Sequence, residues 1–183
     1  MAAGSELPRL DGYRFEVRYS RGSRVRATAA ADIAADAYSY FSRLFSGVEP
    51  DIAVIVTDEA DWPGSGPYGL AFFRDHADEI RPGILVMPAG GGDFWIAMTQ
   101  DIRDASPRGY AKLLATYPDG AGGVDLQPFF DLITIHELGH AFEVLGDLRL
   151  PTYWLSEIFV NLALHAYVAT QLPLRLPTLE VLP

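Results

Sequence analysis

The alternation of apolar and polar residues predicts several strands in the first half of the chain. Residues 13–19 alternate aromatic or aliphatic side chains with charged ones, which is the two-residue period of a half-buried strand. Short apolar runs next to Gly or Pro predict further strands at residues 52–57, 69–73 and 83–88. Residues 94–99 fit either a strand or the start of a helix.

Apolar residues at three- and four-residue spacing predict helices early in the chain and again towards its end. Residues 27–46 are rich in Ala, carry aromatic residues on one face and precede Gly47, a helix stop. Residues 107–116 begin with Pro, which suits a first helical turn. Residues 128–145 form one continuous helical pattern that ends at Gly146, and Pro151 opens a second long helix to about residue 171.

This order of elements predicts one α+β domain over residues 1–183. It divides into a strand-rich part at about 12–127, a helical part at about 128–171, and a tail at 172–183 whose three Pro residues predict an extended chain. A chain of 183 residues with 49% hydrophobic residues is long and apolar enough to bury a core. We therefore expect a globular fold.

No segment of the sequence is expected to cross or target a membrane. There is no run of 18 uncharged apolar residues, and the most apolar long segment, residues 158–172, is expected to be a buried helix. The first ten residues are polar and lack the apolar centre of a signal peptide. These features favour a cytoplasmic location.

Composition limits the chemistry that is available. The chain has no cysteine, which excludes disulfide scaffolds, thiolate metal sites and a cysteine nucleophile, so a metal site must use His and carboxylates. The 14 basic and 24 acidic residues give a net charge of −10, which argues against nucleic acid as a partner. The densest basic stretch, residues 14–26, is expected to be a solvated strand face and turn, with a phosphate site as the alternative.

The segment HELGH at residues 136–140 is an H-E-x-x-H motif within the first predicted C-terminal helix. Two His residues four positions apart lie on one helix face and can bind one zinc ion. Glu137 is rotated by about 100° from His136, so it can act as a general base beside the ion rather than as a ligand. The alternative is two partly exposed His with Glu137 as a surface charge. The apolar run before the motif predicts a buried helix, where polar residues need partners.

A catalytic zinc takes a third protein ligand, and the second C-terminal helix contains a candidate. Glu157 is a lone carboxylate among apolar residues, and an antiparallel helix can bring it to the His pair. Asn161 lies one turn later on the same face, where its oxygen can accept a ring N–H from a ligand His. Asp147, just past the first helix, is either an alternative third ligand or a turn residue at the helix end.

Other residues near the motif have two open interpretations each. His165 either stabilises an oxyanion or is a hydrogen-bonded core histidine, and Tyr153 either lines the cleft or packs at the start of its helix. Residues 83–88 or 94–99 are either the sheet edge to which an extended peptide adds as a strand, or ordinary sheet.

The paired motifs resemble those of the gluzincin metallopeptidases, the group that includes thermolysin and aminopeptidase N. Residues 154–160 read W-L-S-E-I-F-V, similar to W-L-x-E-x-F-A around the glutamate ligand on the aminopeptidase N side, and the resemblance covers about residues 129–167. It implies a zincin-like fold, with a small mixed sheet, an active-site helix and an antiparallel glutamate helix. It implies zinc as cofactor, His136, His140 and Glu157 as its ligands, and Glu137 as the base. The G-x-M-E-N motif of the exopeptidases is absent, so aminopeptidase activity is not implied.

These observations lead to three functional hypotheses. The first is a minimal zinc metallopeptidase acting on a peptide or protein substrate. The second is an inactive zincin-fold protein that serves as a binding or regulatory module with a structural zinc. The third is a latent enzyme whose tail from Leu172 lies across the cleft as a strand, unless that tail is a disordered end. The complete motif favours the first, because a structural zinc site has no need of Glu137.

Overall fold

The computed structural model describes residues 7–64, 66–75, 82–148 and 150–181. It is a mixed α+β structure, which confirms the predicted class at that level. In chain order the elements are β1 Arg9–Leu10, β2 Glu16–Tyr19, α1 Arg24–Leu44, β3 Ile52–Thr57, β4 Phe72–Arg74, β5 Gly83–Pro88, α2 Asp93–Ala105, α3 Pro107–Thr116, α4 Gln127–Leu145, α5 Tyr153–Gln171, the 3-10 turn η1 Pro173–Arg175, and α6 Leu176–Leu179.

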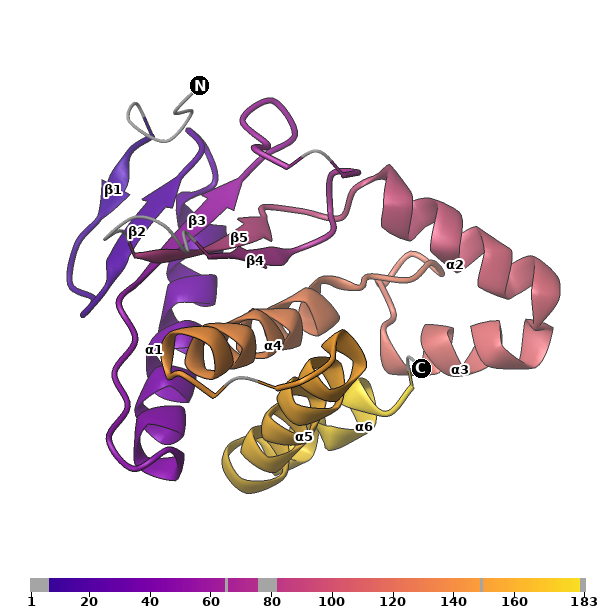
Figure 1. The fold of residues 1–183 in the computed structure, drawn as a ribbon. Helices are drawn as coiled ribbons and strands as arrows, with labels where there is room; N and C mark the ends of the chain where they lie inside the picture. Colours follow the sequence, from indigo (N-terminus) through magenta and orange to yellow (C-terminus); the bar gives the residue numbers. More distant parts are fainter. Residues whose placement is uncertain (1–6, 65, 76–81, 149, 182–183) are drawn as a thin grey trace.

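The strands form one mixed sheet in the order β1-β2-β3-β5-β4 (Figure 1). The central strands β2, β3 and β5 run parallel, whereas β1 and β4 are antiparallel to their neighbours. Parallel neighbours need a crossover connection, and α1 supplies it between β2 and β3. Of the two interpretations of residues 83–88, ordinary sheet is confirmed and the sheet edge is wrong, because β5 lies inside the sheet and β4 lies at its edge.

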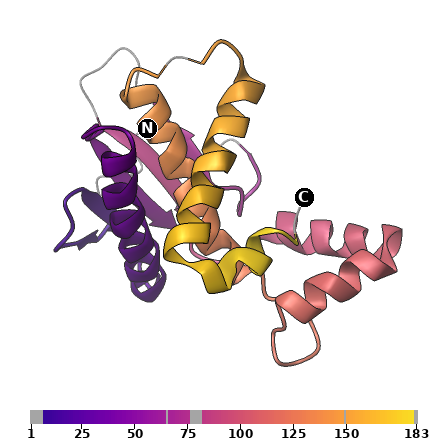
Figure 2. The ribbon, with the colours of Figure 1, turned by 90° about the horizontal axis from the view of Figure 1, so that it is seen from below.

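The helix α4 lies between the sheet and α5 (Figures 1 and 2). It packs on α1, β4 and β5 on one side and on α5 on the other. Fully buried residues from the sheet, α1 and these helices make one core, exemplified by Val54, Leu85, Phe41, Leu138 and Val168. The pair α2 and α3 projects to one side around a smaller cluster. One face of α4 therefore packs against the sheet, and the opposite face packs against α5.

Residues 94–99 belong to a helix, which removes the possibility of a strand or sheet edge there. Trp95, Met98 and Ile102 follow helical spacing in α2 and pack with Phe130 of α4. Elsewhere the differences are at boundaries: β2 begins at Glu16 rather than at residue 13, α1 begins earlier than expected, and β4 is shifted to 72–74.

The prediction of an extended tail is wrong. Residues 173–179 form η1 and α6, with Pro173 and Pro177 in the first turn of each. A Pro at a helix start lacks only an N–H that would have no intrahelical partner, so these residues end α5 without preventing new helical turns. Residues 172–181 therefore do not lie across the cleft as a strand, as the hypothesis of a latent enzyme required.

Residues 158–171 lie in the helix α5 as expected, but only one face of this helix is buried. The outer face of α5 leaves Ile158 48% and Leu162 66% exposed. Across the described residues, no helix combines the length and apolar character that a membrane span requires.

The basic stretch near the N-terminus is paired with carboxylates. Arg14 lies before β2 rather than on its solvent face, and it is 3.0 Å from Glu49. Arg26 lies on α1, 2.9 Å from Asp131 of α4. The pairing of these two arginines argues against a phosphate site at them, but Arg26 is partly buried on a helix rather than part of the expected solvated strand face and turn.

Candidate metal site

The spacing between α4 and α5 is set where Gly139 faces Val160. A Cβ atom built on Gly139 would lie 3.1 Å from Cβ of Val160, closer than carbon atoms normally approach. Gly139 lies inside the H-E-x-x-H motif, and Val160 lies between Glu157 and Asn161. The absence of a side chain at Gly139 therefore lets the two helices that carry the predicted ligands come together.

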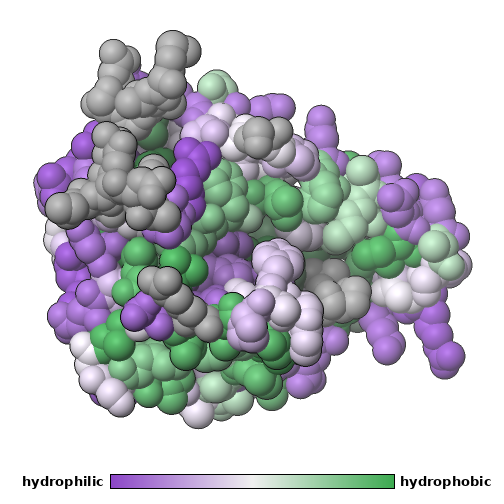
Figure 3. Space-filling view, viewed as in Figure 1, coloured by the Kyte–Doolittle hydropathy of each residue, from purple (hydrophilic) through white to green (hydrophobic). Residues whose placement is uncertain are grey.

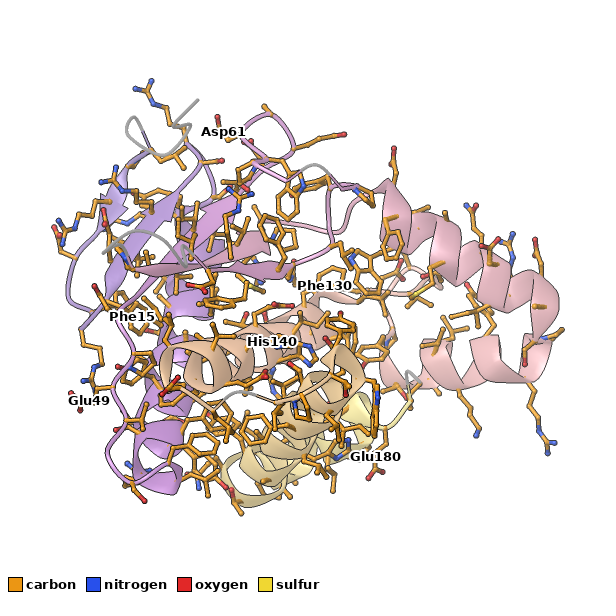
Figure 4. All side chains as sticks on the ribbon, viewed as in Figure 1. Phe15, Glu49, Asp61, Phe130, His140 and Glu180 are labelled. Atoms are coloured by element: carbon orange, nitrogen blue, oxygen red, sulfur yellow. The ribbon has the colours of Figure 1, made fainter. Side chains whose placement is uncertain are left out.

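The three predicted ligands converge at this crossing. Nε2 of His136 and Nε2 of His140 each lie 3.4 Å from an oxygen of Glu157. Two ligand atoms about 2.1 Å from a tetrahedral zinc are about 3.4 Å apart, so these separations fit one ion. One potential ligand atom from each of these three residues lies within 4.8 Å of the other two, which is close enough to bind one metal ion. Figure 4 shows His140 between α4 and α5.

Asn161 lies where the sequence predicted, beside the first histidine. Its Oδ1 is 3.2 Å from Nδ1 of His136. If the amide oxygen accepts a hydrogen bond there, Nδ1 carries the proton and the lone pair of Nε2 faces Glu157. Asn161 therefore favours the tautomer of His136 that binds a metal through Nε2.

Glu143 and Ser156 hold the second histidine, and sequence reasoning missed both. Nδ1 of His140 is 3.3 Å from Oγ of Ser156 and 3.5 Å from a carboxylate oxygen of Glu143. The Ser156 hydroxyl also donates a hydrogen bond to Glu143, which is buried. The available signals were a carboxylate three residues after His140 on a buried helix and a hydroxyl directly before Glu157.

Glu137 is held apart from the ligand group. Its side chain points towards β4, is 7% exposed as a residue and accepts a hydrogen bond from the Phe73 backbone. Burial raises the pKa of Glu137 to about 8, with a smaller contribution from the charge of Glu157, while the Phe73 hydrogen bond opposes the shift. The raised pKa marks a carboxyl group that is easily protonated and deprotonated near neutral pH.

The surroundings of His136 favour its neutral form. Burial lowers the pKa of His136, and so does the neighbouring His140, against the opposing effects of Glu157 and Asn161. Metal binding requires a neutral imidazole, so this environment suits a ligand.

Asp147 lies outside the ligand group and ends α4. It has a positive φ of 59°, its N–H donates to the Val144 carbonyl, and the next N–H, of Leu148, donates to the Glu143 carbonyl at 2.9 Å. This is the Schellman pattern of helix termination. Gly146 is the C-cap as expected, but the left-handed residue is Asp147 and not the glycine. The structure thus supports the turn interpretation of Asp147.

His165 and Tyr153 both lie at the site. His165 is exposed and lines a cavity with Asn161, so the interpretation as a core histidine is wrong. Tyr153 is 78% exposed, so it does not pack at the helix start. A hydrogen bond between its hydroxyl and Glu157 raises the pKa of Tyr153.

The cavity next to His136 and Glu137 has a volume of about 390 Å³. Its remaining walls are mainly apolar side chains of α4, α5 and the segment before β4. Figure 3 shows hydrophobic surface along both sides of the hollow between the sheet layer and the lower helices, with hydrophilic residues inside it. The site therefore combines a polar centre with apolar surroundings, the usual character of a small-molecule or peptide site.

Comparisons of the chain with protein-family models, with curated proteins and with solved structures find no match. The residues of the site themselves are therefore the basis on which a function can be inferred.

Proposed function

We propose that the chain is a zinc-dependent peptidase of the gluzincin type. The observation that carries the proposal is the convergence of His136, His140 and Glu157 with spacings that suit one tetrahedral ion, while Glu137 of the same motif stays outside this group and lines the adjoining cavity beside His136. Two His and one carboxylate leave the fourth position of a zinc ion open, the arrangement of catalytic rather than structural zinc.

Zinc held by these residues would polarise a scissile carbonyl, acidify a water molecule and favour the ionised form of the nearby Glu137. Glu137 then accepts a proton from the attacking water and delivers it to the amine that leaves when the peptide bond breaks. Its burial and its hydrogen bond to Phe73 fix the direction of the carboxyl group. Asn161, Glu143 and Ser156 orient the two imidazoles, so that no ligand has to reorient during the reaction.

A peptide substrate would bind along β4. In the described part of the chain β4 pairs with β5 alone, so the backbone groups of its other edge, apart from the Phe73 N–H bonded to Glu137, are available for a further strand. The backbone of Phe73 in β4 also contacts Glu137, which places this edge beside the base. A strand added here would carry its peptide bonds past Glu137 and the ligand group.

The charge that forms on the carbonyl oxygen during attack requires a donor. His165 on the cavity wall and Tyr153 beside Glu157 are candidate donors at the site. Separate His165→Ala and Tyr153→Phe variants test them, and the donor is the residue whose loss lowers kcat while zinc content stays unchanged.

The decisive experiment combines metal analysis with cleavage of a mixed peptide library. We expect about one zinc per purified chain, lost in His136→Ala and in His140→Ala. Glu137→Gln keeps the shape of the side chain and removes the base, so zinc is retained and hydrolysis falls by at least about 100-fold. Glu59→Gln, the same change at an exposed position, is the control for contaminating proteases and for the substitution itself.

Two results would contradict the proposal. Retention of full zinc by both His variants removes the metal site, and equal hydrolysis by wild type and Glu137→Gln removes Glu137 as the base. Zinc binding without any peptide cleavage would instead favour the second hypothesis, a binding or regulatory module.

A further inference from the structure

The C-terminal helix α6 contributes a wall to the cavity beside the base. Leu179 lines this cavity together with the apolar side chains of Phe129, Leu132, Ile133, Leu164, Leu70 and Ala71. His136 and Glu137 lie at the same cavity, whereas its lining includes neither His140 nor Glu157. A substrate group that enters it must therefore lie on the Glu137 side of the site.

The segment that carries Leu179 is docked on the rest of the protein. Arg175 lies 3.6 Å from Asp131 of α4, and the Tyr117 hydroxyl donates a hydrogen bond to the Thr178 carbonyl. α6 packs on both α4 and α5, and Leu179 is 8% exposed. These contacts fix the position of the Leu179 side chain at the cavity, so that it can act as a defined wall.

We propose that this cavity binds an apolar side chain of the peptide substrate and that Leu179 determines the size of that side chain. The inference rests on the proposed peptidase function and names its substrate class. A peptide along β4 with its scissile bond at Glu137 places one neighbouring side chain at the cavity mouth. The volume of about 390 Å³ suits Leu, Met or Phe together with part of the peptide backbone. Apart from His136, Glu137, Asn161 and His165 the lining is apolar, so most of the wall offers a charged side chain no polar partner and an apolar side chain is preferred.

The test changes the size of residue 179 in both directions. Leu179→Ala enlarges the cavity and shifts the preferred residue from Leu towards Phe or Trp, and Leu179→Phe reduces it and shifts the preference towards Ala or Val. One methylene in such a pocket is worth roughly 10–200-fold, so we expect the Phe-to-Leu ratio of kcat/KM to change by at least about 10-fold. Leu174→Ala, on the same segment but 96% exposed, is the matched control and keeps the wild-type ratio. Zinc content and circular dichroism establish that each variant is folded.

Unchanged cleavage ratios in both folded Leu179 variants would overturn the proposal, and so would an equal loss of cleavage of all peptides. If Leu179→Ala does not fold, Leu179→Phe and Leu179→Val provide the same comparison with smaller changes in packing.

A binding measurement separates this inference from the proposed function. N-acetyl-L-phenylalaninamide is compared with N-acetylglycinamide by calorimetry on the wild-type protein and on Leu179→Phe. Selective binding of the phenylalanine compound that Leu179→Phe weakens supports the pocket even if no peptide is cleaved. Cleavage without side-chain preference, together with equal binding of both compounds, leaves the peptidase in place and rejects the pocket.

Discussion

The contact between Gly139 and Val160 predicts that packing and metal affinity are coupled. In Gly139→Ala the new Cβ would lie 3.1 Å from Cβ and 3.2 Å from Cγ1 of Val160. Carbon atoms prefer about 3.5–4.0 Å, so α4 and α5 must separate by several tenths of an ångström. Val160 is fully buried and β-branched, and it cannot rotate out of the contact. The separation carries Glu157 away from the two histidines.

Two opposing effects determine the stability of Gly139→Ala. Replacing Gly by Ala within a helix gains about 1 kcal/mol, whereas overpacking a core contact costs about 1–3 kcal/mol. We expect a net loss of about 1 kcal/mol in the free energy of unfolding of the metal-free protein. We also expect zinc affinity to fall on the order of 10-fold, because a metal site tolerates little displacement of a ligand.

The assay is chemical denaturation of the metal-free protein together with zinc titration against a chelator. Val160→Gly provides the control, because in the double variant Gly139→Ala/Val160→Gly the nearest remaining atom of residue 160 is its Cα, at 3.5 Å, an ordinary van der Waals contact. We expect the double variant to recover zinc affinity relative to Gly139→Ala, with a coupling energy of about 0.5–3 kcal/mol. Wild-type zinc affinity in Gly139→Ala, or additive effects in the double variant, would refute the idea that this contact sets the ligand spacing.

Other variants test the assignment of the ligands and their supports. Glu157→Ala should weaken zinc binding strongly and Asp147→Ala should leave it nearly unchanged, because the Glu157 oxygens lie 3.4 Å from both His Nε2 atoms while Asp147 ends the helix; zinc titration that shows the reverse order rejects Glu157 as the ligand. Asn161→Ala and Glu143→Ala should each weaken zinc affinity about 10–100-fold, as expected when a group that orients a ligand is lost. A titration in which either variant keeps wild-type affinity shows that the corresponding histidine needs no such support.

The cluster of His136, His140 and Glu157 could be predicted from the sequence because its arrangement is mostly local. His136 and His140 share a helix face at any four-residue spacing, and a short connection between two helices brings Glu157 back to them. Glu143 and Ser156 escaped prediction because a single carboxylate and a single hydroxyl are common on helices. Only the packing of α4 on α5 shows that both meet Nδ1 of His140.

The errors in the predicted fold have two physical sources. The Pro residues of the tail predict an extended chain, but Pro173 and Pro177 occupy helix starts, where a missing N–H does not disrupt the helix. The position of β4 at the sheet edge depends on strand order, a property of pairing between distant segments that no local pattern encodes. Both errors affect the description of the site. The misjudged tail contains Leu179, which lines the cavity, and the misjudged sheet edge is β4, which borders Glu137.

The buried carboxyl group of Glu137 predicts how the stability of the metal-free protein depends on pH. Its pKa is about 8 in the folded protein and 4.5 when exposed, so the folded state holds this proton more tightly than the unfolded chain. The stabilisation is therefore complete below pH 4.5 and is lost as the pH rises towards 8, at up to about 1.4 kcal/mol per pH unit. Glu137→Gln does not titrate, so it lacks this part of the pH dependence.

The measurement is the free energy of unfolding of wild type and Glu137→Gln, in the presence of a chelator, at several pH values between 4 and about 9. The contribution of His136, whose pKa is shifted in the opposite direction, is common to both proteins and largely cancels in the difference. We expect the two to diverge by several kcal/mol in favour of Glu137→Gln as the pH rises, because the variant has no carboxylate to bury. Glu59→Gln should follow the wild type throughout. Parallel curves for wild type and Glu137→Gln would show that Glu137 ionises as easily in the folded protein as in water, and the role of burial in tuning this base would have to be abandoned.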